Sequence, residues 1–163
     1  MAQPKTNAMR LLDKAKIPYQ VHEYSHRDGE AVDGASVAAL LGQDPAQVFK
    51  TLVTKGAGGS FYVFVIPVAK ELDLKKAARS VGEKSVAMLH VADLLKTTGY
   101  VRGGCSPVGM KKQFVTVFDE SVLAQPSVMV SAGKIGTQIQ LAPADLLAVI
   151  RAQTAPLTAG EPS

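Results

Sequence analysis

One ten-residue segment, 103–112, combines three glycines, a proline and two lysines. Glycine and proline at that density are incompatible with a regular helix or strand, so the segment is predicted to be a loop. Its glycines allow backbone N–H groups to approach a ligand closely, and such donors suit a phosphate, a carboxylate or a developing oxyanion. A basic turn between two elements is the simpler interpretation of the same residues.

A second candidate is Lys50, which lies within the mostly apolar residues 48–53. The alternation of a strand places Lys50 on the same face as Val48 and Leu52. A lysine buried among aliphatic neighbours is costly without a partner. Lys50 is therefore either an edge-strand residue that points to solvent, or a cation held inside a pocket for an anionic ligand.

A third candidate is the pattern Ser-x-Gly-Lys-x-Gly at residues 131–136, which lies between two predicted strands. It is either a plain hairpin turn or a second anion-binding loop, with Ser131 as a hydroxyl donor at the strand end. Its spacing is not that of a nucleotide-binding phosphate loop, and no helix follows it.

A protein nucleophile or a metal site is not favoured. The chain has a single cysteine, Cys105, and the sequence places none of its three histidines (His22, His26 and His90) beside it. A reactive thiol needs a nearby base and a lowered pKa, so Cys105 is interpreted as a packing residue. His22 and His26 lack a third ligand motif, so no metal is expected, and no cofactor motif is present.

The bulk composition predicts one globular domain. The chain has 163 residues, a hydrophobic fraction of 47% and a net charge of +4 from 18 basic and 14 acidic residues. The modest positive charge favours an anionic partner such as RNA. A single cysteine, no signal-like apolar run and no segment long enough to span a bilayer together predict a soluble cytoplasmic protein. The domain is expected to cover 1–151, with a flexible tail at 152–163.

Helices and strands are predicted in a mixed order, without a strict alternation. Caps and apolar spacing predict a helix capped by Asn7 and ended before Pro18, and a helix capped by Asp73. Further helices are predicted at 36–41, 45–47, 91–98 and 144–151. Strands are predicted at 19–24, 48–54, 61–68, 85–89, 114–118, 127–130 and 137–141. This order favours a mixed sheet with packed helices over a doubly wound parallel fold.

Taken together, these segments resemble the YbaK family of aminoacyl-tRNA deacylases and the editing domain inserted in bacterial prolyl-tRNA synthetases. Each segment alone is a weak signal, and the combination is specific. The matching segments are residues 22–24, 48–52, 72–78, 98–101, 103–112 and 130–134. Three positions depart from the family pattern: Asp33, Ala132 and Ile135.

The resemblance implies an α+β fold: a mixed, mostly antiparallel, barrel-like sheet with surrounding helices and a pocket for the aminoacylated 3′ end of tRNA. It implies that Lys50 is the essential catalytic residue. The substrate-binding residues implied by the matching segments are Tyr24, Gly103, Gly104, Ser106, Pro107, Gly109, Ser131, Gly133 and Lys134.

The resemblance also implies an activity, a trans-editing deacylase that removes cysteine from Cys-tRNA(Pro) and Cys-tRNA(Cys). In that family the substrate's own thiol attacks its ester, with no cofactor and no protein nucleophile. The implied partners are the acceptor end of aminoacyl-tRNA and prolyl-tRNA synthetase, with no membrane and no metal. The alternatives are a hydrolytic Ala-tRNA(Pro) deacylase, a non-catalytic accessory protein that binds tRNA or a synthetase, and a domain that binds a small phosphorylated molecule.

Overall fold

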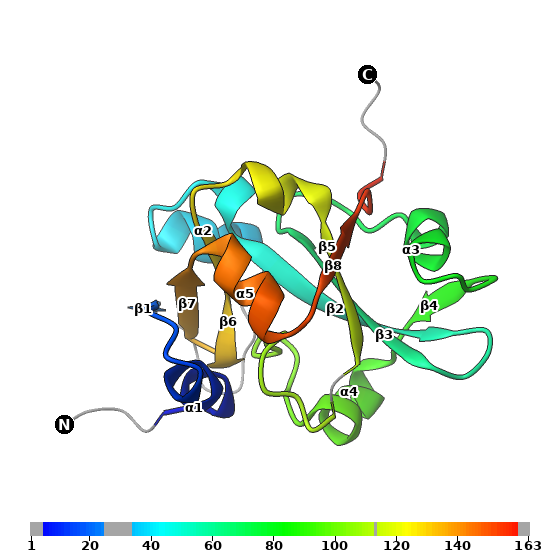
Figure 1. Ribbon diagram of the computed structural model, residues 1–163, viewed down its shortest axis with the longest axis horizontal. Helices are drawn as coiled ribbons and strands as arrows, with labels where there is room; N and C mark the ends of the chain where they lie inside the picture. The colour runs from blue at the N-terminus through cyan, green and yellow to red at the C-terminus, as the bar shows by residue number, and fades with distance from the viewer. Residues whose placement is uncertain (1–4, 25–33, 113, 160–163) are drawn as a thin grey trace.

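The computed structural model describes residues 5–24, 34–112 and 114–159, and in them the chain forms two β-sheets with helices packed around them (Figure 1). The strands are β1 (Gln20–Glu23), β2 (Phe49–Gly56), β3 (Phe61–Pro67), β4 (Val86–Met88), β5 (Val115–Asp119), β6 (Val128–Lys134), β7 (Thr137–Leu141) and β8 (Gln153–Ala155). One sheet has the order β1-β7-β6, and the other has the order β4-β2-β3-β5-β8.

The helices lie close to where the sequence predicts them. They are α1 (Asn7–Lys14), α2 (Gly34–Leu40), α3 (Leu74–Ser80), α4 (Val91–Thr98) and α5 (Pro143–Val149), with single 3-10 turns η1 (Pro45–Gln47) and η2 (Glu120–Ala124). Asp73 caps α3, as predicted, by accepting hydrogen bonds from the backbone N–H groups of Lys75 and Lys76. Within the described ranges, no helix is long and apolar enough to cross a bilayer.

The pairing of the strands confirms a mixed, mostly antiparallel α+β fold. Among the described strands, β3–β5 and β5–β8 pair in parallel, and the other neighbours pair antiparallel. The two sheets touch through an isolated parallel bridge between Val48 and Met129. The barrel-like arrangement is not a closed barrel, because within the described residues strand pairing between the two sheets is limited to this bridge.

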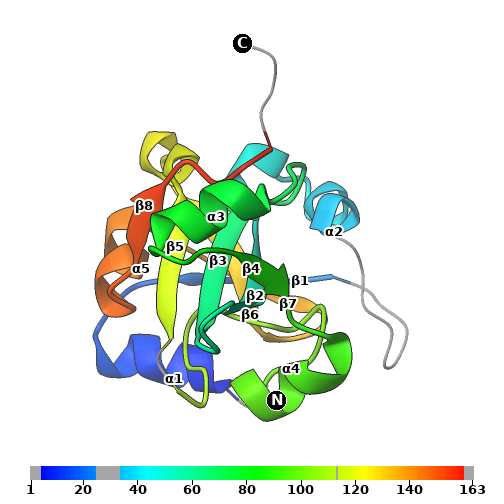
Figure 2. The same cartoon turned by 90° about the vertical axis from the view of Figure 1, so that its right-hand side faces the viewer.

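The five-stranded sheet is buried on both faces, and β3 shows why. Val63 and Val65 face the core between the sheets, where α1 and α5 also pack. Phe64 and Ile66 point to the opposite face, which α3 covers with Ala77 and other small side chains (Figure 2). A strand covered on both sides reads as one continuous apolar run, which is the pattern of residues 61–69.

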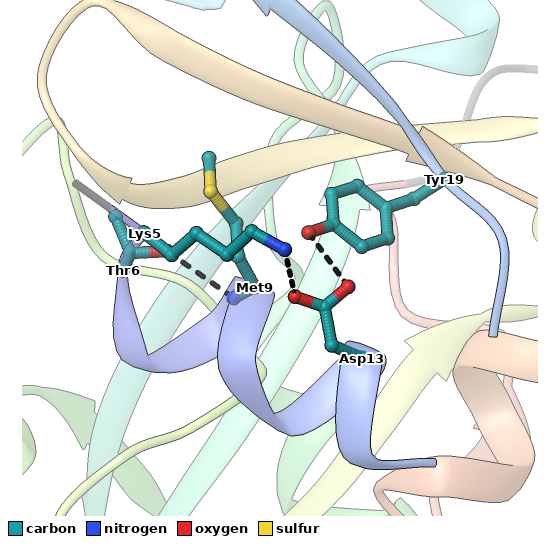
Figure 3. A network of polar contacts seen from close by, with 5 residues as sticks. All are labelled: Lys5, Thr6, Met9, Asp13 and Tyr19. Carbon is teal, nitrogen blue, oxygen red and sulfur yellow. Dashed lines mark hydrogen bonds and ion pairs between the residues drawn. The ribbon is translucent and has the colours of Figure 1, made fainter. Parts of the chain in front are cut away.

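The start of α1 differs from the prediction by one residue. Thr6, and not Asn7, is the N-cap, because the Thr6 hydroxyl oxygen accepts a hydrogen bond from the Met9 N–H (3.2 Å). Asp13 at the other end of α1 accepts hydrogen bonds from Lys5 and from the Tyr19 hydroxyl (Figure 3). The hydrogen bond from Lys5 lowers the pKa of Asp13. This network ties the segment before α1 and the segment before β1 to the helix.

The C-terminal segment is the clearest correction to the sequence-based expectation of a flexible tail. Residues 153–155 form β8, which pairs in parallel with β5. Leu157 follows and is 0% exposed, and its backbone N–H donates to the buried Asp119 carboxylate (3.0 Å). The described part of the tail, up to residue 159, therefore packs against the five-stranded sheet.

Replacing Leu157 with alanine should destabilise the fold by about 2–4 kcal/mol, the usual cost of emptying a fully buried leucine site. Leu123 is the matched control, because it is 65% exposed on η2. Leu123→Ala is expected to change stability by less than about 0.5 kcal/mol. Denaturant unfolding monitored by circular dichroism gives both values. Equal, small losses in the two variants would mean that the tail does not contribute to the core.

Candidate functional site

The candidate site is a pocket at the junction of the two sheets, next to the Val48–Met129 bridge. This bridge is isolated, and residues from β2 and β6 line a cavity of about 340 Å³ beside it. Among the described strands, none pairs with the side of β2 opposite β3 there, because β4 pairs only with the far end of β2, at Thr54–Gly56. The pocket is lined by Tyr24, Val37, Val48, Phe49, Lys50, Thr51, Leu52, Val68, Arg102, Gly103, Cys105, Ser131 and Gln138.

The charge of the pocket favours an anionic ligand. Lys50 is half-buried and lines the pocket. Its predicted role toward an anionic ligand stays a prediction. Arg102 is a second cation in the lining, and the described lining residues include no Asp or Glu. Neither cation forms an ion pair within the described part of the chain. Arg102 is solvent-exposed and Lys50 is half-buried, and two positive charges that line one cavity raise the local concentration of phosphates and carboxylates.

Arg102 and Gly103 are the two central residues of a tight turn. The N–H of Gly104 donates to the carbonyl oxygen of Val101 (2.9 Å), and Gly103 has a φ of 81°. A positive φ at the third residue is typical of a type II turn and favours glycine there. The turn holds Arg102 and Gly103 at the pocket. The Gly104 N–H is already bonded to Val101 inside the turn. Of the two glycines Gly103 and Gly104, only Gly103 can therefore offer its N–H to a ligand.

Gly104 is required for a different reason, the contact between the two predicted loops. A Cβ atom on Gly104 would lie 2.9 Å from the backbone N of Ile135 and 3.0 Å from the backbone of Lys134. The 103–112 loop and the 131–136 loop are thus packed backbone to backbone. Ser131, at the start of the second loop, lines the pocket and accepts a hydrogen bond from the Gly133 N–H (3.2 Å), so its hydroxyl hydrogen is not used in that bond.

Four of the predicted site residues come together in the pocket: Tyr24, Lys50, Gly103 and Ser131. Gly109 and Gly133 lie instead against the ring of Tyr100, whose hydroxyl donates to the Val108 carbonyl oxygen (2.6 Å). Burial raises the pKa of Tyr100 to about 12.

The other predicted residues also lie outside this lining. Ser106 and Pro107 are buried in the loop, and the Ser106 hydroxyl oxygen accepts from the Val108 N–H (3.2 Å). Lys134 lines a separate hollow with Lys5 and Tyr19. Two of the predicted glycines contact the segments that carry Gly103 and Ser131: Gly104 packs against the backbone of Lys134 and Ile135, and the Gly133 N–H donates to Ser131. The predicted role of all these residues as direct substrate ligands stays a prediction, and Asp33 lies outside the described residues.

Cys105 lines the pocket but is poorly suited to act as a nucleophile. Burial raises the pKa of its thiol to about 12, and the hydrogen bond with Thr98 opposes this shift only in part. The thiolate is the reactive form, so at neutral pH the folded protein holds almost none of it. Within the described ranges, no group of three His, Cys, Asp or Glu side chains is placed to hold a metal ion.

Sequence reasoning missed three polar residues of the lining: Thr51, Arg102 and Gln138. Thr51 follows Lys50 directly, and Arg102 precedes the glycine pair, so both lie next to recognised motifs. Gln138 had no such signal, because it lies on β7, away from these motifs in the sequence. Pairing of β7 with β6 places Gln138 opposite Ser131 and so at the pocket.

The fold and the site define a class of protein: an α+β domain with a pocket between two sheets, whose described lining carries two cationic side chains and no Asp or Glu. The chain belongs to the aminoacyl-tRNA editing domain family, whose model matches residues 29–149.

Individual relatives agree with this assignment. A protein of Enterococcus faecalis named "Putative Cys-tRNA(Pro)/Cys-tRNA(Cys) deacylase EbsC" is 48% identical over 159 residues, which cover 98% of this chain and 96% of that protein. A proline–tRNA ligase of Fervidobacterium nodosum is 33% identical over 75 residues, 46% of this chain and 13% of the ligase. A crystal structure described as "a putative trans-editing enzyme for prolyl tRNA synthetase" is 27% identical with a TM-score of 0.81, over 97% of this chain and 100% of that one.

Proposed function

We propose that this protein is a trans-editing deacylase that removes cysteine from Cys-tRNA(Pro), and also from Cys-tRNA(Cys). The observation that carries the proposal is the pocket itself. It combines Lys50, Arg102, the Gly103 turn and the Ser131 hydroxyl, and its one thiol is held protonated. Such a site can hold the phosphates and the ester of an aminoacylated 3′ end. The relative from Enterococcus faecalis, similar over nearly its whole length, supports the same substrate class.

The proposed chemistry uses the substrate's own thiol. The cysteine sulfur attacks the ester carbonyl carbon and forms a C–S bond, and the C–O bond to the terminal ribose then breaks. The thiol proton ends on the ribose oxygen, and cysteine leaves as a cyclic thiolactone. Because nucleophile and ester belong to one molecule, correct orientation supplies much of the rate enhancement. Lys50 and the Gly103 N–H would position the ester end and stabilise negative charge on the carbonyl oxygen.

The proposed partners follow from the size of the chain. It has 163 residues and only a modest positive charge, which leaves little surface for reading a tRNA beyond its acceptor end. We propose that it recognises mainly the aminoacylated end, takes its preference for proline tRNA from prolyl-tRNA synthetase, and works in the cytoplasm. Strong discrimination between cysteinyl-tRNAs by the purified chain alone would contradict this part of the proposal.

The test compares cysteinyl-tRNA(Pro) with alanyl-tRNA(Pro), each incubated with the purified chain. Release of cysteine is expected to exceed release of alanine at least about 100-fold, because only cysteine carries an internal nucleophile. Mass spectrometry of the fresh product should detect the thiolactone. Preferential release of alanine would assign the chain to the hydrolytic alternative. Turnover of neither would leave a binding protein with an editing fold.

A further inference from the structure

Gln138 is a buried polar residue to which the proposed reaction assigns no role. It lies on β7, the central strand of the three-stranded sheet, paired with His22 on β1 and Ser131 on β6. The residue is one of those that line the pocket, although it is only 6% exposed. Its amide oxygen has no hydrogen-bond partner among the residues that the structure describes.

A buried acceptor without a partner is unusual. The large majority of buried polar atoms in folded proteins are hydrogen-bonded, because an unpaired acceptor loses its bonds to water and gains nothing. Thr51, which lines the pocket from β2, is in a similar situation: its buried hydroxyl oxygen has no partner within the described ranges. Two such groups, on strands of different sheets, point to a ligand that carries hydrogen-bond donors.

In the amino-acid part of the proposed substrate, the strong hydrogen-bond donor is the α-amino group. This group is repelled by cations and needs an acceptor, and Lys50 and Arg102 have no acceptor atoms. The described lining contains no carboxylate that could receive it. The unpaired amide oxygen of Gln138 is suited to do so, whether the amine is protonated or neutral, since both forms donate N–H bonds.

We propose, on the basis of the proposed function, that Gln138 accepts a hydrogen bond from the α-amino group of the substrate and selects esters with a free amine. A neutral amide suits this position physically. A carboxylate at the same place would attract Lys50 or Arg102 and cancel the positive charge that the ester and phosphates need. The amide receives the amine without that loss. Esters whose amine is acylated, including peptidyl-tRNA, are then poor substrates.

The experiment combines two substrates with two proteins. The substrates are cysteinyl-tRNA(Pro) and 3-mercaptopropionyl-tRNA(Pro), which keeps the thiol and the ester but lacks the amine. The proteins are the wild type and Gln138→Leu, and each rate is divided by the enzyme-free rate of the same ester. The wild type is expected to prefer the amine-bearing ester about 10- to 100-fold, the range for losing one hydrogen bond to a charged group. Gln138→Leu should lose this preference, and Gln138→Glu, which keeps an acceptor oxygen, should retain it.

Gln140→Leu is the matched control on the same strand. Gln140 lies outside the pocket lining and is hydrogen-bonded to His22 (2.8 Å) and Ser127 (2.7 Å). Its loss should lower thermal stability and leave the preference unchanged. No preference in the wild type, or an undiminished preference in Gln138→Leu, would overturn the inference and leave the proposed function intact. An equal loss for both esters would also overturn it. Failure of the wild type to release cysteine at all would instead overturn the proposed function, and this inference with it.

Discussion

Replacing Lys50 with methionine is expected to lower kcat/KM for cysteinyl-tRNA(Pro) about 100- to 1,000-fold, the usual cost of removing one group that stabilises developing charge. Methionine keeps an unbranched apolar stem of similar length and removes the charge. Packing of the stem beside Val48 and Leu52 is therefore retained, and the loss reports on the ammonium group. Single-turnover deacylation with saturating enzyme measures the chemical step, and circular dichroism confirms that the variant is folded.

Lys55→Met is the control for this experiment. Lys55 lies on the same strand, but it is exposed outside the pocket, with its ammonium 5.9 Å from the centre of the Phe61 ring. Its replacement should change the rate by no more than about twofold, as for most surface positions. If Lys50→Met behaved like Lys55→Met, Lys50 would have no part in the reaction. A loss confined to KM would indicate binding of phosphate or ribose, and a loss in kcat would indicate stabilisation of the carbonyl oxygen.

The contrast between Lys50 and Gln138 shows what sequence can predict about such a site. Lys50 stands out locally, since a charged residue inside an apolar strand needs an explanation. Gln138 stands in the alternating run Thr137–Leu141, where a polar residue is expected on every second position. What makes Gln138 unusual is its burial beside a pocket, and that depends on the distant β2 strand. Sequence patterns identify a residue whose polarity differs from that of its neighbours along the chain. They miss a residue whose polarity is unusual only for its surroundings in the folded structure.

The tail illustrates the same difference in the fold. Residues 154–163 are rich in Pro, Thr and Ala, a composition typical of an unstructured end. Contacts with distant residues hold the described part of it: β8 pairs with β5, the Leu157 side chain is fully buried, and the Leu157 N–H donates to the Asp119 carboxylate. The helices were easier to predict, because their caps and apolar spacing are local. Even there the exact start of α1 was ambiguous, because Thr and Asn are both good N-cap residues. Thr6 is the N-cap, while the Asn7 side chain accepts a hydrogen bond from Arg10 (3.3 Å).

The glycine loop shows how a correct motif can carry a different physical reason. The sequence suggests that its glycines expose backbone donors to a ligand. In the structure Gly103 fits that expectation, because it is the positive-φ residue of the turn at the pocket. Gly104, Gly109 and Gly133 are instead places where a Cβ would meet neighbouring backbone or the Tyr100 ring. The glycines of these loops are therefore needed mainly for close packing between neighbouring segments, and only Gly103 among them lines the pocket.

Gly104→Ala is therefore expected to impair both the fold and the reaction. The added methyl group meets the backbone of Lys134 and Ile135, which cannot move as a flexible side chain would. Overpacking of this kind should destabilise the protein by about 1–3 kcal/mol. The two loops must then separate, which displaces Gly103 from Ser131 across the pocket. A misplacement of about 1 Å can lower a rate about 100-fold, so a loss of at least tenfold in deacylation is expected in the variant that remains folded.

Gly58→Ala separates this effect from the general consequences of replacing a glycine. Gly58 lies in the turn between β2 and β3, has no positive φ, and its added Cβ would lie 3.6 Å from the Glu83 side chain, an ordinary contact. Its replacement should leave activity unchanged and shift stability by less than about 1 kcal/mol. Urea unfolding and deacylation are measured on both variants. Wild-type activity and stability in Gly104→Ala would show that the loops are not in the close contact described, and that the position of Gly103 does not depend on Gly104.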